Sequence, residues 1–461
     1  MKIKPTLLTL ALSLIGVISL PSLAADNITA PNQVLILKPR LEQLIQTALT
    51  TDLGRDQLLI KSQAMRETSI AAASLPDPKL KIGFSGLPTN SFAFNQDPMT
   101  TISIGASQQF GRGSTLPLQQ QKIQQQADTV LDQADVRALT VTQNMTQLWL
   151  ELGYQQQLQQ ILRQNLTLMK QLVSSIRINY AIGKSPSQDL LQGQLQVSKI
   201  EEQLQANQQR QQTIMAQLSE WLGSRWLTQN TIIDATNTLH WQKLMQLMGQ
   251  LSNPSERYQL LRHNPMVTAA ETAISAQTTQ IAISEQAYKP QFGVDLMYGA
   301  RQASNMAGQP VADVVSAFVT MDLPLFTSNR QNRNRNAAKY QEQAAKLQRD
   351  LLLQQMNAKL DALLATRTQQ QQRLNQYQTV LIKQAQERTK AVERGYKNGT
   401  SRFDDVINAS RDELDLATAQ ARLTTDLSLT DNNLAYLLNS YDYQPHLTTF
   451  TANLSQQLGT R

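Results

Sequence analysis

Two short segments of the chain carry the same four residue types in the same order. A constant separation of 216 positions (396 minus 180) relates the two segments. A glycine can end a helix in a left-handed conformation, a serine can cap the next helix, and an aspartate in the first turn suits the helix dipole. Both segments therefore predict turns between two helices. The residues are Tyr180, Gly183, Ser185 and Asp189 in the first segment and Tyr396, Gly399, Ser401 and Asp405 in the second.

The residue types needed for catalysis or metal binding do not converge in this sequence. His240, His263 and His446 lie far apart, and the chain has no cysteine. No Ser-His-Asp arrangement or phosphate-binding glycine loop occurs either, and the methionines fall mostly at apolar positions of predicted helices and strands, where core packing is their usual role. The sequence therefore predicts a protein that is not an enzyme, with no metal site and no cofactor.

The duplication extends to predicted β-strands. Apolar and polar residues alternate at about residues 79–86 and 101–110 in the first copy, and at about 291–300 and 313–326 in the second. Such alternation is typical of strands with one apolar and one polar face. A membrane-inserted sheet and a half-buried sheet on a soluble core would give the same pattern.

A long helical hairpin follows each predicted strand pair. Apolar residues recur at alternating steps of three and four, which is coiled-coil spacing. The first hairpin is predicted at about 115–220 with its tip at 180–189, and the second at about 329–440 with its tip at 396–405. Each outgoing helix would have about 65 residues and be about 100 Å long.

These features divide the chain into five regions. Residues 1–24 contain two lysines, an apolar run and small residues, which predicts a signal peptide, with a retained membrane anchor as the alternative. We predict a first repeat at 25–220, an equatorial insert at 221–264, a second repeat at 265–440 and a C-terminal tail at 441–461. No other stretch is apolar enough for a membrane helix, so an exported soluble protein or insertion by strands remains.

The charge of the chain does not indicate nucleic-acid binding. The formal net charge is +7, and two of the lysines fall in the predicted signal peptide. The remaining charges are scattered along the predicted helices instead of forming the basic face that phosphate binding needs.

The number of predicted strands limits how the protein can assemble in a membrane. Four short strands cannot close a membrane barrel, because the smallest single-chain barrels have about eight, and an open edge would leave backbone groups unpaired in lipid. Several copies would therefore share one barrel. The helices are longer than the bilayer core of about 30 Å, so they must project into water.

The order of these motifs resembles the TolC family of outer-membrane efflux proteins. The resemblance rests on the duplicated unit, on Ser-Leu-Pro-Asp-Pro-Lys-Leu at 74–80, on Leu-Pro-Leu-Phe at 323–326 and on the paired turns. It implies an α+β membrane protein, namely a homotrimer that shares a twelve-stranded transmembrane β-barrel in outer-membrane lipid and extends into the periplasm as an α-helical coiled-coil tunnel. It further implies two partners, a periplasmic adaptor and an inner-membrane pump of the RND type.

The same resemblance assigns roles to the two tips. It implies that Tyr180, Gly183, Ser185, Tyr396, Gly399 and Ser401 dock the adaptor, and that Asp189, Asp405 and Tyr396 gate the periplasmic aperture. Two positions depart from the family pattern. Ser401 replaces a gate arginine found in some members, although Arg402 is adjacent, and Asn408 replaces a second acidic residue.

The substrate expectation also rests on resemblance. Residues 75–80, 86–88 and 98–100 are most similar to the branch that serves heavy-metal efflux pumps. This similarity implies passive conduction of heavy-metal cations. The alternatives are a channel for drug efflux or for type I protein secretion, and a periplasmic coiled-coil adaptor or structural protein.

Overall fold

The computed structural model describes residues 40–223 and 233–443. The predicted signal peptide and residues 444–461 of the predicted tail lie outside this part of the chain. Within the described part, no helix is both long and apolar enough to cross a membrane.

Each repeat begins with a helical segment that the sequence analysis did not identify. In the first repeat, α1 (Leu41–Thr51) is followed by α2 (Leu53–Ala72). The carboxylate of Asp52 caps α2, because it accepts hydrogen bonds from the backbone N–H groups of Gly54 and Arg55, both at 3.2 Å.

The second repeat starts in the corresponding way with α8 (Pro265–Gln286). Its cap is Asn264, whose side-chain oxygen accepts a hydrogen bond from the N–H of Met266 at 3.0 Å. Each repeat therefore has a helix before its strand pair as well as a hairpin after it.

The four strands form one antiparallel sheet in the order β1-β2-β3-β4. They are β1 (Lys79–Ser85), β2 (Thr101–Gln109), β3 (Gln291–Ala300) and β4 (Val314–Asp322). The sheet and the long helices confirm the predicted fold class. The β2–β3 pairing joins the two repeats, whereas β1 and β4 are the edges of the sheet.

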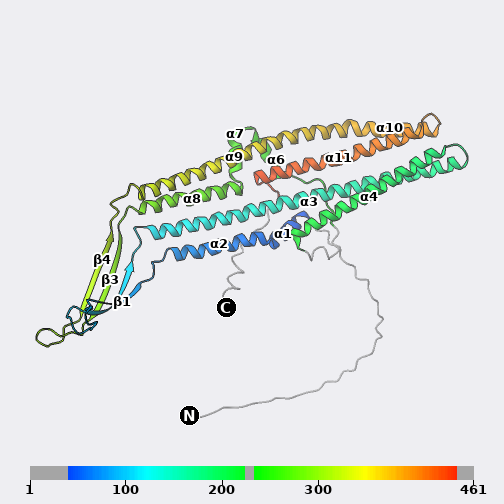
Figure 1. Ribbon diagram of the computed structural model, residues 1–461. Coiled ribbons are helices and arrows are strands. Elements are labelled where there is room, and N and C mark those ends of the chain that lie inside the picture. The colour runs from blue at the N-terminus through cyan, green and yellow to red at the C-terminus, as the bar shows by residue number, and fades with distance from the viewer. Residues whose placement is uncertain (1–39, 224–232, 444–461) are drawn as a thin grey trace, which may run out of the picture. The chain divides into compact units, whose positions relative to one another are not determined.

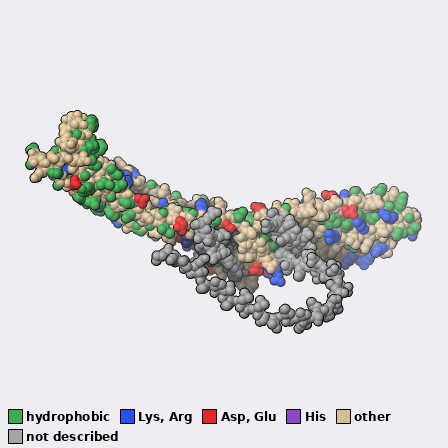
Figure 2. Space-filling model, turned by 90° about the horizontal axis from the view of Figure 1, so that it is seen from below, with side chains coloured by type: hydrophobic (Ala, Val, Ile, Leu, Met, Phe, Trp, Pro, Cys, Tyr) green, Lys and Arg blue, Asp and Glu red, His purple; other side chains and the backbone are tan. Residues whose placement is uncertain are grey.

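The two faces of the sheet differ in chemistry. On one face, Ile82 lies opposite Ile104, Ile104 opposite Tyr298, and Tyr298 opposite Val315, and all four side chains are exposed. The other face carries serines, threonines, glycines and an ion pair between Lys81 and Asp295 on different strands. Figure 2 shows hydrophobic side chains gathered at the sheet end, with charged side chains spread along the helices.

Strand β4 is shorter than predicted. The expected strand at 313–326 ends at Asp322, because Pro324 has no N–H group to continue the ladder. After it, the N–H of Leu325 donates to the carbonyl oxygen of Leu323 at 2.9 Å, which turns the chain toward the next helix.

The first hairpin consists of α3 (Thr115–Ala181) and α4 (Ser187–Leu222). Within α3, Gly153 is needed for a close approach of another segment. A Cβ atom at this position would lie 2.2 Å from the backbone carbonyl carbon of Thr236 and 2.5 Å from the nitrogen of Asn237.

The second hairpin is interrupted once on its outgoing side. Helix α9 (Gln331–Gln376) continues through a π-helical turn, η2 (Tyr377–Leu381), into α10 (Ile382–Lys397), and the chain returns in α11 (Phe403–Leu438). The hairpin therefore has a single wider turn in a helix that is otherwise continuous.

The predicted equatorial insert contains short helices around the middle of the hairpins. They are α6 (Gln242–Met248), η1 (Gly249–Ser252) and α7 (Pro254–Arg262). Trp241, 7% exposed, lies 6.4 Å from Tyr441 between ring centroids and belongs to a buried cluster with residues of α3, α9 and α11. This packing ties the insert to both repeats.

Near the sheet, helices α2, α3, α8 and α9 lie side by side, and the hairpin tips lie at the opposite end of the helices (Figure 1). The helices α2 and α8 run toward the sheet, and α3 and α9 run away from it. Hydrogen bonds join each neighbouring pair of these helices. Between α2 and α3, the Ser62 hydroxyl donates to the carbonyl oxygen of Ala127 at 2.8 Å. Between α3 and α8, Thr279 donates to Gln125 at 2.7 Å, and between α8 and α9, Thr278 donates to Glu342 at 3.0 Å.

Candidate docking and gating site

The first predicted tip ends α3 with two backbone hydrogen bonds. The N–H of Gly183 donates to the carbonyl of Tyr180 at 3.0 Å, and the N–H of Lys184 donates to Asn179 at 2.8 Å. Gly183 has a φ of +73°. This pattern is the Schellman motif, which needs a left-handed residue after the helix.

The second tip repeats this geometry. The N–H of Gly399 donates to Tyr396 at 3.1 Å, the N–H of Thr400 donates to Gly395 at 2.8 Å, and Gly399 has a φ of +75°. A Cβ atom on Gly183 or Gly399 would meet no atom within 4 Å. The two glycines are therefore required by the backbone conformation and not by lack of space.

The serines of the tips do not cap the returning helices. Pro186 and Arg402 occupy the capping positions, and within the described residues neither Ser185 nor Ser401 makes a capping hydrogen bond to the first helical N–H groups. Instead, Ser401 packs against Gly395, where a Cβ atom would lie 2.2 Å from the serine hydroxyl. The expectation of serine capping was therefore wrong.

Asp405 performs the capping in the second hairpin. Its carboxylate accepts a hydrogen bond from the N–H of Arg402 at 3.0 Å, at the start of α11. The side chain of Arg402 turns to the neighbouring Asp404, with 3.3 Å between Nη2 and Oδ2. Asp405 thus stabilises its own helix, and Asp404 takes part in the charge interactions of the tip.

Asp189 of the first hairpin lies within electrostatic range of the second hairpin. Burial raises the pKa of Asp189, the charge of Asp404 raises it further, and the positive charge of Arg402 opposes both effects. The structure therefore brings together Asp189, Asp404 and Arg402. We call these three residues the tip charge cluster.

Tyr396 lies beside an aromatic residue that the sequence analysis missed. Its ring centroid is 6.0 Å from that of Phe403, at an interplanar angle of 55°. Phe403 is only 3% exposed, and it packs in a cluster with Ile176 and Ile200 of the first hairpin. Within the described residues, the Tyr396 hydroxyl makes no hydrogen bond to an aspartate.

Phe403 has a sequence signal that could have revealed it. At the 216-residue offset, Phe403 corresponds to Ser187, so one tip has a large aromatic residue where the other has a small polar one. The ring also approaches Gly193, where a Cβ atom would lie 3.4 Å from the ring. Phe403 therefore couples the two hairpins near their tips.

Replacing Phe403 with alanine should loosen the tips. Deleting a buried aromatic side chain costs about 3–5 kcal/mol, and here the lost contacts join two hairpins. We expect faster proteolytic cleavage near both tips, measured by limited proteolysis of the purified oligomer. The control is Leu168→Ala on α3, since Leu168 is 62% exposed. Equal cleavage rates in the two variants would contradict the coupling role.

A groove of about 480 Å³ lies between the two hairpins above the tips. Asn165 and Met169 of α3 line one side, and Thr389, Glu393 and Tyr396 of α10 line the other. The lining is a mixture of polar and apolar side chains, which suits a protein surface better than a small hydrophobic ligand.

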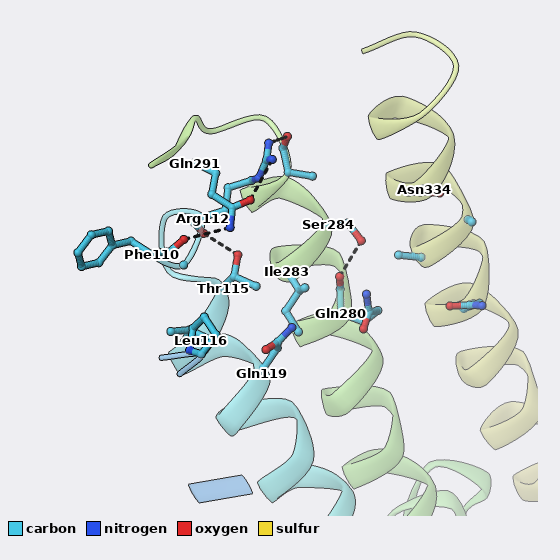
Figure 3. A pocket seen from close by; sticks show the side chains of 16 residues that line it. Phe110, Arg112, Thr115, Leu116, Gln119, Gln280, Ile283, Ser284, Gln291 and Asn334 are labelled. Atoms are coloured by element: carbon cyan, nitrogen blue, oxygen red, sulfur yellow. Dashed lines mark hydrogen bonds between the residues drawn. The ribbon is translucent and has the colours of Figure 1, made fainter. Parts of the chain in front are cut away.

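A second cavity, of about 640 Å³, lies where the helices meet the sheet (Figure 3). Arg112 crosses one end of it and donates to the carbonyl oxygen of Lys289 at 3.2 Å, to Gln291 at 3.3 Å and to Asp322 at 3.2 Å. Because Arg112 belongs to the first repeat and all three acceptors belong to the second, we interpret this region as a structural junction between the repeats, where the sheet meets the helices.

The described residues contain no group of three or more side chains arranged to hold a metal ion. The charged and polar groups at the tips can form hydrogen bonds and ion pairs with a protein surface.

A family model described as outer membrane efflux protein matches residues 257–440. These residues cover α8, both strands of the second repeat and the whole of the second hairpin. Among curated proteins, a sequence search finds no significant match.

Solved structures with the same fold cover most of the chain. The outer membrane protein VceC of Vibrio cholerae is 18% identical, with a TM-score of 0.70 over 88% of this chain and 97% of that one. The channel-forming protein CusC is 15% identical, with a TM-score of 0.69 over 87% and 92%. The outer membrane channel CmeC of Campylobacter jejuni is 11% identical, with a TM-score of 0.68 over 87% and 85%. Residues 257–440 therefore match the model of the outer membrane efflux protein family, and the chain as a whole has the fold of these outer-membrane channels.

Proposed function

We propose that the chain is the outer-membrane channel subunit of a tripartite efflux system and acts as a homotrimer. The observation that supports this proposal most is the four-stranded sheet with unpaired edges β1 and β4, attached to two long helical hairpins. A sheet with open edges is not stable in lipid, because its unpaired backbone groups cannot be hydrated there. Sharing one barrel among copies removes those edges.

The two faces of the sheet support a lipid-facing exterior and a water-filled interior. The exposed apolar face, which includes Ile82, Ile104 and Tyr298, suits contact with acyl chains. The opposite face, with Lys81 and Asp295, suits an aqueous lumen. The helices would continue this lumen through the periplasm toward the adaptor and the pump, which we take to be of the RND type.

We propose heavy-metal cations as the substrate class because of the motifs at 75–80, 86–88 and 98–100. The similarity to CusC is no greater than that to VceC, so the fold comparison favours no single branch of the family. Metal efflux and drug efflux can be distinguished by comparing the growth of a deletion strain on toxic metal salts with its growth on drugs. A strain sensitive only to drugs would contradict the metal proposal.

We further propose that the two tips dock the adaptor and gate the channel. The Schellman turns at Gly183 and Gly399 present Tyr180, Ser185 and Ser401 near the outer ends of the hairpins. The tip charge cluster lies between the hairpins, where a change of charge would alter their separation. In this proposal Asp189 acts with Asp404 and Arg402, while Asp405 and Tyr396 support the second tip.

Replacing Arg402 with glutamine should make the resting channel leak. Arg402 offsets the repulsion between Asp189 and Asp404, and an exposed pair of this kind contributes up to about 1 kcal/mol. We expect the resting conductance in planar bilayers to rise about twofold. Arg402→Lys keeps the charge and should restore the low conductance.

The leak of the glutamine variant should fall in acid. Because the pKa of Asp189 is raised in the packed tip, protonation stabilises that tip, and this stabilisation is lost as the pH rises through the raised pKa. Lowering the pH toward the raised pKa therefore removes the repulsion. A leak that does not change with pH would contradict a role for the tip charge cluster.

The channel proposal has a direct test. We expect the protein in the outer-membrane fraction as an oligomer that is dissociated by heat in detergent, and we expect purified oligomer to conduct ions in planar bilayers. Recovery as a freely soluble monomer would overturn the proposal.

A further inference from the structure

The connection from β4 to α9 and the first turns of α9 carry an unbalanced positive charge. Residues 323–341 contain four basic side chains and no acidic one, and Lys289, just before β3, adds a fifth. Helix α9 begins at the end of the helices next to the sheet (Figure 1). The positive charge therefore lies where the helices meet the strands. The four basic residues of 323–341 are Arg330, Arg333, Arg335 and Lys339.

The acidic side chains near this charge already have basic partners within the chain. These ion pairs are Asp322 with Arg112, Glu285 with Arg335, and Glu342 with Lys346. Four exposed cations remain, and none of them has an ion-pair partner among the residues that the structure describes. We call them the basic rim. They are Lys289, Arg330, Arg333 and Lys339.

The basic rim does not stabilise the start of α9. Positive side chains in the first turn of a helix oppose its dipole, and α9 has neither an acidic residue in that turn nor a side-chain cap among the described residues. The first residues of α3 and α9 are separated by the offset of the repeats, 216 positions (331 minus 115). At that offset Ser114 and Pro117 correspond to Arg330 and Arg333. The first repeat starts the equivalent helix without these charges, so the arginines indicate a ligand and not a requirement of the fold.

Exposed apolar side chains adjoin the basic rim. Leu323 is 56% exposed, Leu325 is 73% exposed and Phe326 is 89% exposed. Leu323 follows Met321 at the two-residue spacing of the apolar face of β4. Apolar side chains next to cations are typical of the boundary of a bilayer, where the former contact acyl chains and the latter reach the phosphate groups. A phospholipid can satisfy both kinds of side chain at once.

We propose that the basic rim binds the phosphate headgroups of anionic phospholipids in the membrane leaflet nearest the helices. The inference rests on the proposed channel function, because it takes the apolar face of the sheet to lie in lipid. Arginine suits this role, since its guanidinium group can donate two parallel hydrogen bonds to one phosphate. A zwitterionic headgroup binds less well, because its own ammonium group is repelled by the rim. Basic clusters beside membrane-spanning segments select anionic lipids for the same reason.

The test is the lipid preference of the purified oligomer, measured by native mass spectrometry in detergent. Phosphatidylglycerol and phosphatidylcholine with the same acyl chains are added separately. We expect the unmodified oligomer to bind phosphatidylglycerol about tenfold more tightly. Arg330→Gln with Arg333→Gln should reduce this preference to about twofold. If that double variant fails to form the oligomer, each single replacement gives the same test with a smaller loss.

Two control variants separate the charge of the rim from other effects. Arg330→Lys with Arg333→Lys keeps the charge and should retain most of the preference. Lys383→Gln with Lys390→Gln removes the same charge from exposed positions of α10, toward the tips, and should retain the full preference. An equal preference in the rim glutamine variant and in this α10 variant would overturn the inference.

A further measurement distinguishes a lipid from a free anion. Inorganic phosphate at the concentration of the lipid should not displace phosphatidylglycerol, because it lacks the acyl chains that Leu325 and Phe326 would contact. Displacement would overturn the lipid assignment in favour of a free-phosphate site. A heat-sensitive, conducting oligomer without any preference for phosphatidylglycerol would overturn the basic rim and leave the proposed channel standing. Absence of that oligomer from the outer membrane would defeat the proposed function itself.

Discussion

Replacement of both Gly183 and Gly399 with valine should abolish efflux and leave membrane insertion intact. Both glycines have φ values above +70°, a conformation that costs a β-branched residue about 1–3 kcal/mol at each site. The strain would disturb both tips and therefore the surface offered to the adaptor. The measurement is the sensitivity of cells to the exported compounds, together with the amount of heat-sensitive oligomer in the outer membrane.

The matched control replaces the same two glycines with asparagine. Asparagine tolerates the left-handed conformation, and a Cβ atom on either glycine meets nothing within 4 Å. We therefore expect the asparagine variant to retain efflux. Normal efflux in the valine variant would contradict the docking role of the tips, and loss of the oligomer would show that the strain acts on the whole fold.

Replacement of Gly153 with leucine should lower the free energy of unfolding by about 3 kcal/mol or more. The first added atom would already lie 2.2 Å from backbone of the equatorial insert, which cannot move as a flexible side chain could. The measurement is the temperature at which the oligomer dissociates in detergent, supported by unfolding in denaturant.

Gly249→Ala provides the control for this second prediction. Gly249 lies in the same insert, and a Cβ atom there would meet no atom within 4 Å. We expect its dissociation temperature to match that of the unmodified protein. If Gly153→Leu also matches it, the insert does not pack on α3 as the structure shows.

The strands and hairpins could be predicted because local spacing determines them. Alternation specifies a strand with two different faces, as in β2, and glycine at the right position specifies a helix end. The positive φ angles at Gly183 and Gly399 agree with this interpretation. Local chemistry was sufficient wherever a residue's role depends only on its neighbours in the chain.

Helix α2 was missed for a physical reason. Its buried positions are the serines Ser62 and Ser69, while Leu53 and Ile60 point away from α3. The usual signal of a helix, apolar residues on the face toward its nearest partner, is therefore reversed in α2 within one copy of the chain.

The tip charge cluster could not be predicted either, because it depends on contacts between hairpins. Asp189 and Asp404 are 215 residues apart (404 minus 189), and the packing of the two hairpins on each other, to which Phe403 contributes, brings them near. The aspartate predicted from the repeat, Asp405, serves its own helix instead. The sequence repeat therefore identified the turn at the second tip, but it did not show whether Asp404 or Asp405 faces the first tip.

The π-helical turn at Tyr377–Leu381 makes the second hairpin tolerant of length changes that the first hairpin would not accept. A π-turn holds one residue more than an α-helical turn, so losing that residue leaves a regular α-helix with both flanks still in register. A one-residue loss in the uninterrupted α3 would rotate everything beyond it by about 100°. A one-residue deletion at Tyr377–Leu381 would therefore leave the direction of the second tip unchanged, an evolutionary step that the uninterrupted α3 does not allow.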